Sequence, residues 1–137
     1  MSKYLGAIIV GGSISITGIA TAFAIGQWRL RKHRGVSREE FVGTFAAAGV
    51  PPEVPGTVYD FYRRSSISSA FSVAPDDSYR QVLSKGEEDI DDDARFLIRK
   101  LRLKIPADYA MERSQARIET LRDMVVWLDR IRRRQSL

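Results

Sequence analysis

The chain of 137 residues contains no cysteine and only one histidine, His33. Disulfide bonds, thiolate nucleophiles and cysteine-ligated metals are therefore excluded. A single histidine inside a basic run forms neither a histidine-rich metal site nor the base of a hydrolytic triad. A glycine-rich phosphate-binding loop is also missing. The sequence therefore predicts a protein that is not an enzyme and that holds no metal and no other cofactor.

Charge is missing from residues 5–25, LGAIIVGGSISITGIATAFAI, which also lack proline, asparagine and glutamine. At 1.5 Å per residue, a helix of this length spans about 30 Å, the thickness of a bilayer core. Tyr4 and Trp28 bracket the run, where interfacial aromatic residues belong. We therefore expect a short flank at residues 1–4 and a transmembrane helix over residues 5–28, in contact with a lipid bilayer.

The two flanks of this apolar run differ in charge. The C-terminal flank reads WRLRKHR, whereas the N-terminal flank holds only Lys3 and the α-amino group. The positive-inside tendency therefore places the N-terminus outside and the rest of the chain in the cytoplasm, as in a single-pass protein of the cell inner membrane. Residues 29–36 become a basic juxtamembrane linker that is also suited to anionic lipid. The predicted membrane-interface residues are Tyr4, Trp28, Arg29, Arg31, Lys32 and Arg34.

Two other interpretations of the apolar run remain open. Ala22-Phe23-Ala24 has the form of a signal-peptide cleavage site. The dense basic cluster that follows retards translocation and favours an anchor over a cleaved signal. A buried helix of a soluble domain is the third interpretation, and the lack of any polar face argues against it.

Small residues recur along one ridge of the predicted membrane helix. Such ridges let membrane helices pack closely, which indicates a homo-oligomer or a membrane partner. The alternative is that small residues are simply common in membrane spans. The predicted packing residues are Ala7, Gly11, Ser15, Gly18, Ala22 and Gly26.

Residues 37–137 have the spacing of an all-α bundle without internal repeats. Ser37, followed three residues later by Glu40, is typical of a capping box, so a helix is expected from about residue 38 until Gly49 and the following prolines. A second helix is expected from residues 53–56 to Ser65. A Ser-, Pro- and Asp-containing loop should follow, pinned to the core by Phe71 and Val73.

Two further helices are expected in the C-terminal half. Apolar residues from Ile90 to Leu101 recur at helical spacing, and Ser84 with Glu87 fits a capping box before them. Thr120 with Asp123 fits another, ahead of an apolar stripe from Leu121 to Ile131. Residues 107–119 are also suited to helix, with breaks that the pattern does not place.

These pieces, taken in order, resemble the acyl carrier protein family over roughly residues 54–131. A first helix, VPGTVYDFYRR, precedes a long loop that ends in VAPDDSYRQVL, similar to the family's V-x-P-x-x-S-F/L-x-x-D-L stretch. An acidic second helix follows, and then a segment from LKIP to TLRDMVVWL, with about five extra residues before Thr120. The resemblance implies a small helical carrier-like domain.

One departure from the family changes the implied function. Carrier proteins hold phosphopantetheine on a serine at the start of the second helix, four residues after the loop's last leucine. Counting from Leu83, that position is Glu87, which cannot accept the phosphodiester. Ser84 stands three residues too early, and a helix-capping role accounts for it. We therefore expect no phosphopantetheine, with Ser84 as the alternative attachment site.

The acidic run at the start of the third predicted helix has four interpretations. The helix dipole stabilises carboxylates in a first turn. In the resembled family, an acidic second helix docks basic partners, and electrostatic complementarity sets rate and specificity. The run can also meet a basic cluster of its own chain, at residues 29–34 or 130–134. Calcium is excluded, because an EF-hand needs Gly and Glu where Ala94 and Lys100 stand.

We therefore expect a membrane-anchored, non-catalytic docking module with a basic protein partner, linked to lipid or acyl-chain metabolism by the resemblance alone. The alternatives are an oligomeric membrane structural component and a true carrier modified at Ser84. The C-terminal arginines lack any accompanying nucleic-acid motif, and the dipole favours them at a helix C-terminus, which argues against nucleic acid. The predicted partner-binding residues are Glu87, Glu88, Asp89, Asp91, Asp92 and Asp93.

Overall fold

A computed structural model describes residues 35–65 and 72–137. Its helices are α2 (Arg38–Ala46), α3 (Glu53–Ser65), α4 (Glu87–Lys100), α5 (Tyr109–Gln115) and α6 (Leu121–Gln135). The described ranges contain no β-strand, and their one isolated bridge joins Ser78 to Thr120. The predicted all-α class is therefore confirmed for this part of the chain.

The predicted membrane segment is not covered by this description. Residues 5–28, with the small-residue ridge, and the basic run at 29–34 lie outside the described ranges. Within those ranges, no helix is long and apolar enough to cross a bilayer. Residues Gly35–Leu137 form one compact unit by themselves.

Helix α2 begins and ends for the local reasons that the sequence predicts. The Ser37 hydroxyl accepts a hydrogen bond from the Glu40 amide at 3.2 Å, which satisfies one of the free N–H groups of the first turn. Gly49 then adopts a left-handed φ of 74°, which glycine reaches without a steric penalty. Pro51 follows and prevents the helix from continuing.

Helix α6 has the most complete cap of the domain. The Thr120 hydroxyl accepts from the Asp123 amide at 3.3 Å, and the Asp123 carboxylate accepts from the Thr120 amide at 3.0 Å. The predicted capping pair is therefore confirmed. Backbone bonds also hold the long loop against this end of α6, because the Tyr79 amide donates to Glu119 and the Leu121 amide donates to Asp77.

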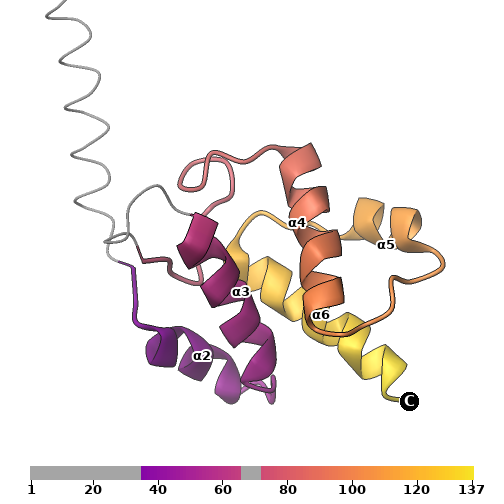
Figure 1. Ribbon diagram of the computed structural model, residues 1–137, viewed down its shortest axis with the longest axis horizontal. Helices are drawn as coiled ribbons and strands as arrows, with labels where there is room; N and C mark the ends of the chain where they lie inside the picture. The colour runs from indigo at the N-terminus through magenta and orange to yellow at the C-terminus, as the bar shows by residue number, and fades with distance from the viewer. Residues whose placement is uncertain (1–34, 66–71) are drawn as a thin grey trace, which may run out of the picture. The chain divides into compact units, whose positions relative to one another are not determined.

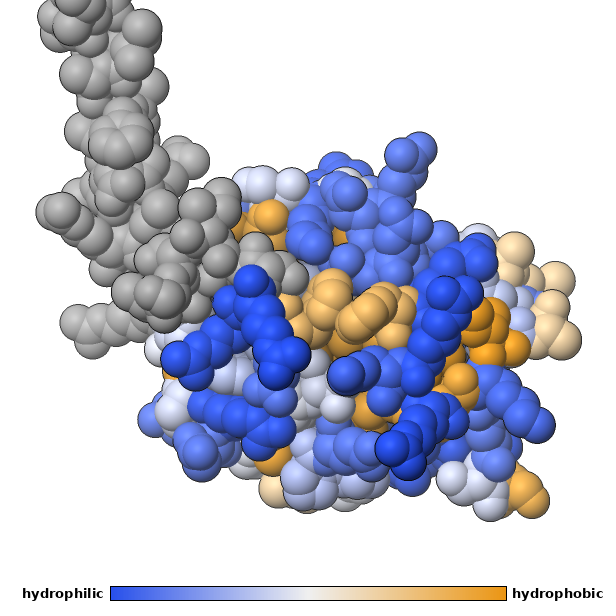
Figure 2. Space-filling view, in the orientation of Figure 1, coloured by the Kyte–Doolittle hydropathy of each residue, from blue (hydrophilic) through white to orange (hydrophobic). Residues whose placement is uncertain are grey.

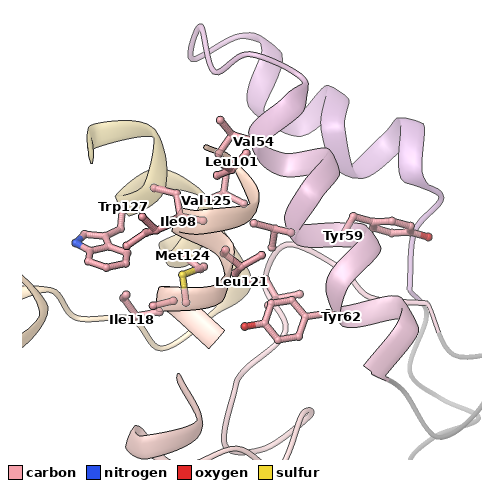
Figure 3. Close-up of a cluster of buried hydrophobic side chains, with 14 of the residues drawn as sticks. Val54, Tyr59, Tyr62, Ile98, Leu101, Ile118, Leu121, Met124, Val125 and Trp127 are labelled. Atoms are coloured by element: carbon pink, nitrogen blue, oxygen red, sulfur yellow. The ribbon is translucent and has the colours of Figure 1, made fainter. Parts of the chain in front are cut away.

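Helix α3 occupies the middle of the fold, since it packs against α2, α4 and α6 (Figure 1). Apolar side chains from α3, α4 and α6 point toward one another and form the core (Figure 3). Val73, in the loop before α4, is fully buried as expected, whereas Phe71 lies outside the described residues. The fully buried core side chains include Phe41, Val58, Ala94, Leu97, Ile98, Leu121, Met124, Val125 and Leu128.

We expect Leu128→Ala to lower the free energy of unfolding by about 2–5 kcal/mol, because it removes a fully buried side chain and leaves a cavity. Val126, on the same helix, is 44% exposed, so Val126→Ala should change stability by less than about 0.5 kcal/mol. Chemical denaturation followed by circular dichroism measures both values. Equal losses of stability in the two variants would show that Leu128 does not lie on the core-facing side of α6.

Candidate functional site

Helix α4 begins at Glu87, with Gly86 as its N-cap. Gly86 has no side chain to cap the helix, but its own amide donates to the Asp89 carboxylate at 3.1 Å. The carboxylate thus satisfies a backbone donor and also sits where the helix dipole favours negative charge. A cap at Ser84 would have started the helix at Lys85, two residues before its actual start at Glu87.

The predicted capping role of Ser84 is wrong. Residues 78–85 form a tight turn that includes Ser84, in which the Leu83 amide donates to Ser78 at 3.1 Å and the Lys85 amide donates to Tyr79 at 2.8 Å. This turn holds Ser84 at a left-handed φ of 54°, whereas an N-cap residue needs extended backbone. Ser84 is therefore an exposed residue that closes a turn and stands apart from the helix start.

The six predicted partner-binding acids fall into three environments. Glu88, Asp89 and Asp92 are exposed and form no ion pair within the described part of the chain. We call these three residues the acidic ridge. Asp91 is half-buried, and Asp93 is buried. Glu87 is exposed but already paired with a cation of the same chain.

Asp93 faces inward, which corrects the expectation that all six acids point to solvent. Its Oδ2 accepts from the Tyr62 hydroxyl at 2.9 Å and from the Lys85 ammonium at 2.8 Å. The Tyr62 hydroxyl also lies 2.7 Å from that of Tyr79. A buried carboxylate needs such partners because an unpaired charge is costly away from water.

The aromatic members of this buried cluster keep their protons. Burial is the largest cause that raises the pKa of Tyr62 and of Tyr79 above the ordinary tyrosine value. Both hydroxyls therefore remain neutral at physiological pH. The Lys85 ammonium also lies 5.4 Å from the centroid of the Tyr62 ring, within the range of a cation–π contact. The cluster thus joins α3, the long loop and α4.

Helix α5 contacts the N-terminal end of α4 through Asp91 and Glu87. The Tyr109 hydroxyl donates to Asp91 Oδ1 at 2.7 Å, and Arg113 Nη2 donates to Glu87 Oε2 at 3.0 Å. Arg95 Nε completes the set by donating to Asp91 Oδ2 at 3.1 Å. Glu87 and Asp91 are therefore engaged by cations and a hydroxyl of their own chain.

Two pKa shifts mark this contact between α4 and α5. Burial acts to raise the pKa of Asp91, but the hydrogen bonds from Tyr109 and Arg95 and the nearby guanidinium of Arg113 outweigh it, so the pKa is below its usual value. Burial, followed by the hydrogen bond to Asp91, raises the pKa of Tyr109 to about 12. The contact is therefore between an ionised carboxylate and a neutral phenol.

The cations that meet the acidic run were not all visible in the sequence. Arg95 follows Asp91 by four residues, and such a pair is readable from helical spacing. Arg113 lies in the extra residues before Thr120, and no local pattern connects it to Glu87. The C-terminal arginines pair elsewhere: Arg132 and Arg133 with Asp129, and Arg134 with Glu112.

The described residues bring carboxylates, cations and a phenol together at α4. They contain no group of three or more histidine, aspartate or glutamate side chains placed to hold a metal ion. The acids of α4 are hydrogen-bond acceptors, either paired with Lys85, Arg95 and Arg113 or exposed on the acidic ridge. An exposed set of carboxylates is suited to electrostatic contact with a basic surface.

We expect Asp93→Ala to destabilise the domain by roughly 1–3 kcal/mol, because the Tyr62 hydroxyl and the Lys85 ammonium lose their shared acceptor. The neighbouring Asp92→Ala should have little effect, since Asp92 is exposed and unpaired among the described residues. Urea denaturation compares the two variants. A loss at Asp92 as large as that at Asp93 would contradict the inward placement.

We also expect the Asp91 contact to be lost in acid. Because the folded pKa of Asp91 lies below its unfolded value of about 3.9, its stabilisation is complete above that value and disappears as pH falls through the folded pKa. The Asp91→Asn variant should therefore lose less stability than the wild type between about pH 5 and pH 2. Circular dichroism follows the unfolding of both proteins as the pH is lowered. A constant difference in stability between wild type and Asp91→Asn across this pH range would contradict the expectation.

No protein-family model, curated protein or solved structure matches this chain, so the resemblance to carrier proteins depends on the residues quoted above.

Proposed function

We propose that this protein is a membrane-anchored, non-catalytic docking module whose carrier-like helical domain presents the acidic ridge to a basic protein partner. The observation that carries this proposal is the contrast within α4. Asp93, Asp91 and Glu87 are satisfied inside the domain, whereas Glu88, Asp89 and Asp92 remain exposed without a cation among the described residues. Three unpaired carboxylates on adjacent turns leave a local negative potential for a partner to neutralise.

The order of the elements supports the carrier-like part of the proposal. Helix α3 is followed by a long connection to the acidic helix α4, and α6 closes the domain, as in the resembled family. The position that would hold the carrier serine is Glu87, the first residue of α4, and its carboxylate is paired with Arg113. A domain of this kind with a glutamate at that position engages partners and carries no cargo there.

The electrostatics of α4 favour recognition over a purely structural role. The helix dipole stabilises carboxylates in the first turn, and Asp89 also accepts from the Gly86 amide. Asp92 lies beyond the first turn and Glu88 caps no donor, so the local fold does not require their charge. Exposed charges of this kind raise association rates and set specificity in a salt-dependent way.

Membrane anchoring is the second part of the proposal. It rests on the uncharged run at residues 5–25, the aromatic bracket of Tyr4 and Trp28, and the basic flank that follows. An anchored docking domain meets its partners at the membrane surface. The resemblance to carrier proteins points to lipid or acyl-chain metabolism as the setting.

We expect the charge-reversal variant Glu88→Lys, Asp89→Lys, Asp92→Lys to lose a salt-sensitive partner that the wild type retains in a crosslinked pull-down from membranes. The matched control reverses three exposed acids elsewhere, Glu39, Glu53 and Glu119, and changes net charge equally. The control should keep the partner, and circular dichroism should show both variants folded. Equal capture by both variants would refute docking at the acidic ridge.

A further inference from the structure

An aromatic pair lies where α3 meets α4, and Phe61 in it also contacts the Tyr62 ring and the Lys85 ammonium. The Phe61 and Phe96 rings have centroids 5.0 Å apart and are tilted by 32°. Phe61 is only partly buried against the core, and Phe96 is 49% exposed. Large aromatic surface that remains in water is unfavourable, so the exposed ring of Phe96 calls for an explanation beyond core packing.

Cationic side chains flank the aromatic pair on both helices. Arg64 follows Phe61 by three residues, and Arg99 and Lys100 follow Phe96 by three and four, so each cation lies one helical turn from its ring. All three are exposed, and none forms an ion pair within the described part of the chain. On the side of the domain drawn in Figure 2, apolar surface lies at the centre with hydrophilic side chains on either side.

We call Phe61, Phe96, Arg64, Arg99 and Lys100 the aromatic–basic face. Its chemistry differs from that of the acidic ridge, although both use α4. The acids belong to the N-terminal half of the helix and the cations to the C-terminal half, the polarity that the helix dipole favours. Asp92, one turn before Phe96, is the carboxylate nearest in sequence on the exposed side and marks the boundary between the two surfaces.

Chain length limits how far this domain can lie from the bilayer. Nine residues, Arg29–Ser37, connect the predicted span to α2, and they reach at most about 30 Å when fully extended. A folded domain of about 100 residues has a radius of gyration near 13 Å, so a tether of this length keeps the membrane surface within its reach. This step rests on the proposed membrane anchor.

We propose that the aromatic–basic face binds the surface of an anionic phospholipid bilayer. Aromatic rings are favourable at the level of the lipid headgroups, and arginine and lysine bind phosphate and the negative surface potential. The face offers both chemistries side by side, as interfacial protein surfaces do. Repulsion between the anionic lipid and the acidic ridge, which includes Asp92, tilts α4, so that its C-terminal half meets lipid and its N-terminal half points to the cytoplasm.

This orientation connects the two surfaces of α4 in one arrangement. Glu88 and Phe96 are eight residues apart, which is about 12 Å along the helix axis. With Phe96 at the headgroups, the acidic ridge lies outside the lipid layer and remains free for a basic partner. The lipid-bound domain therefore presents its docking surface away from the membrane.

The absence of cysteine makes a single-label test possible. The full chain is reconstituted in vesicles of phosphatidylcholine alone or with phosphatidylglycerol, and Phe96→Cys carries an environment-sensitive dye. We expect a blue shift and quenching by lipid-borne nitroxide only with phosphatidylglycerol. The control label at Ser114→Cys, an exposed position on α5, should remain in water in both vesicles.

Two double variants test the role of charge with the same label. The double variant Arg99→Gln, Lys100→Gln should lower the equilibrium constant for lipid binding by about thirtyfold. Each basic residue at the membrane surface contributes about 1 kcal/mol, and the variant removes two of them. The matched pair Arg117→Gln with Arg130→Gln removes two exposed cations that form no ion pair among the described residues, and it should leave the lipid response unchanged. An equal loss in both pairs would overturn a specific lipid-binding face.

Carbonate extraction of the same vesicles separates the two proposals. Release of the chain by carbonate would refute the membrane anchor, while the dye at position 96 still reports lipid contact before extraction. A water-like dye signal in an extraction-resistant protein would refute the aromatic–basic face alone. A dye that is equally buried in both lipid compositions would indicate a second copy of the chain and would also overturn the proposal.

Discussion

The carboxylate of Asp93 is the interaction on which the arrangement of α4 depends. It is buried, and a buried charge is tolerated only when its partners are in place. Those partners come from α3, through Tyr62, and from the loop before α4, through Lys85. Because all three groups must meet, the rotation of α4 about its own axis is determined, and with it the direction of every other α4 side chain.

The surface of the domain follows from that rotation. With Asp93, Ala94 and Leu97 turned inward, Asp92 and Phe96 are turned outward on the same helix. Tyr109 and Arg113 of α5 then bind Asp91 and Glu87 at the N-terminal end of α4. What remains exposed is an acidic N-terminal half and a basic C-terminal half on one helix.

Much of the local structure could be predicted, because it depends on neighbours in sequence. Ser37 and Thr120 cap their helices as expected, since the hydroxyl and the amide that it accepts from are three residues apart. Ser84 had the same spacing to Glu87 but failed as a cap, because the turn that includes it holds it in a left-handed conformation. The competing bonds of that turn, from Leu83 to Ser78 and from Lys85 to Tyr79, carry no comparable sequence signature.

The sequence by itself determined the all-α class of the described domain, the caps of α2 and α6 and the concentration of acid at the start of α4. Each of these depends on residues within one or two helical turns. Only the tertiary structure decided which acids are exposed, because their partners are distant in sequence: Tyr62 is 31 residues from Asp93, and Arg113 is 26 residues from Glu87. Contacts at such separations form only when the helices pack, so helical spacing alone could not sort the six carboxylates.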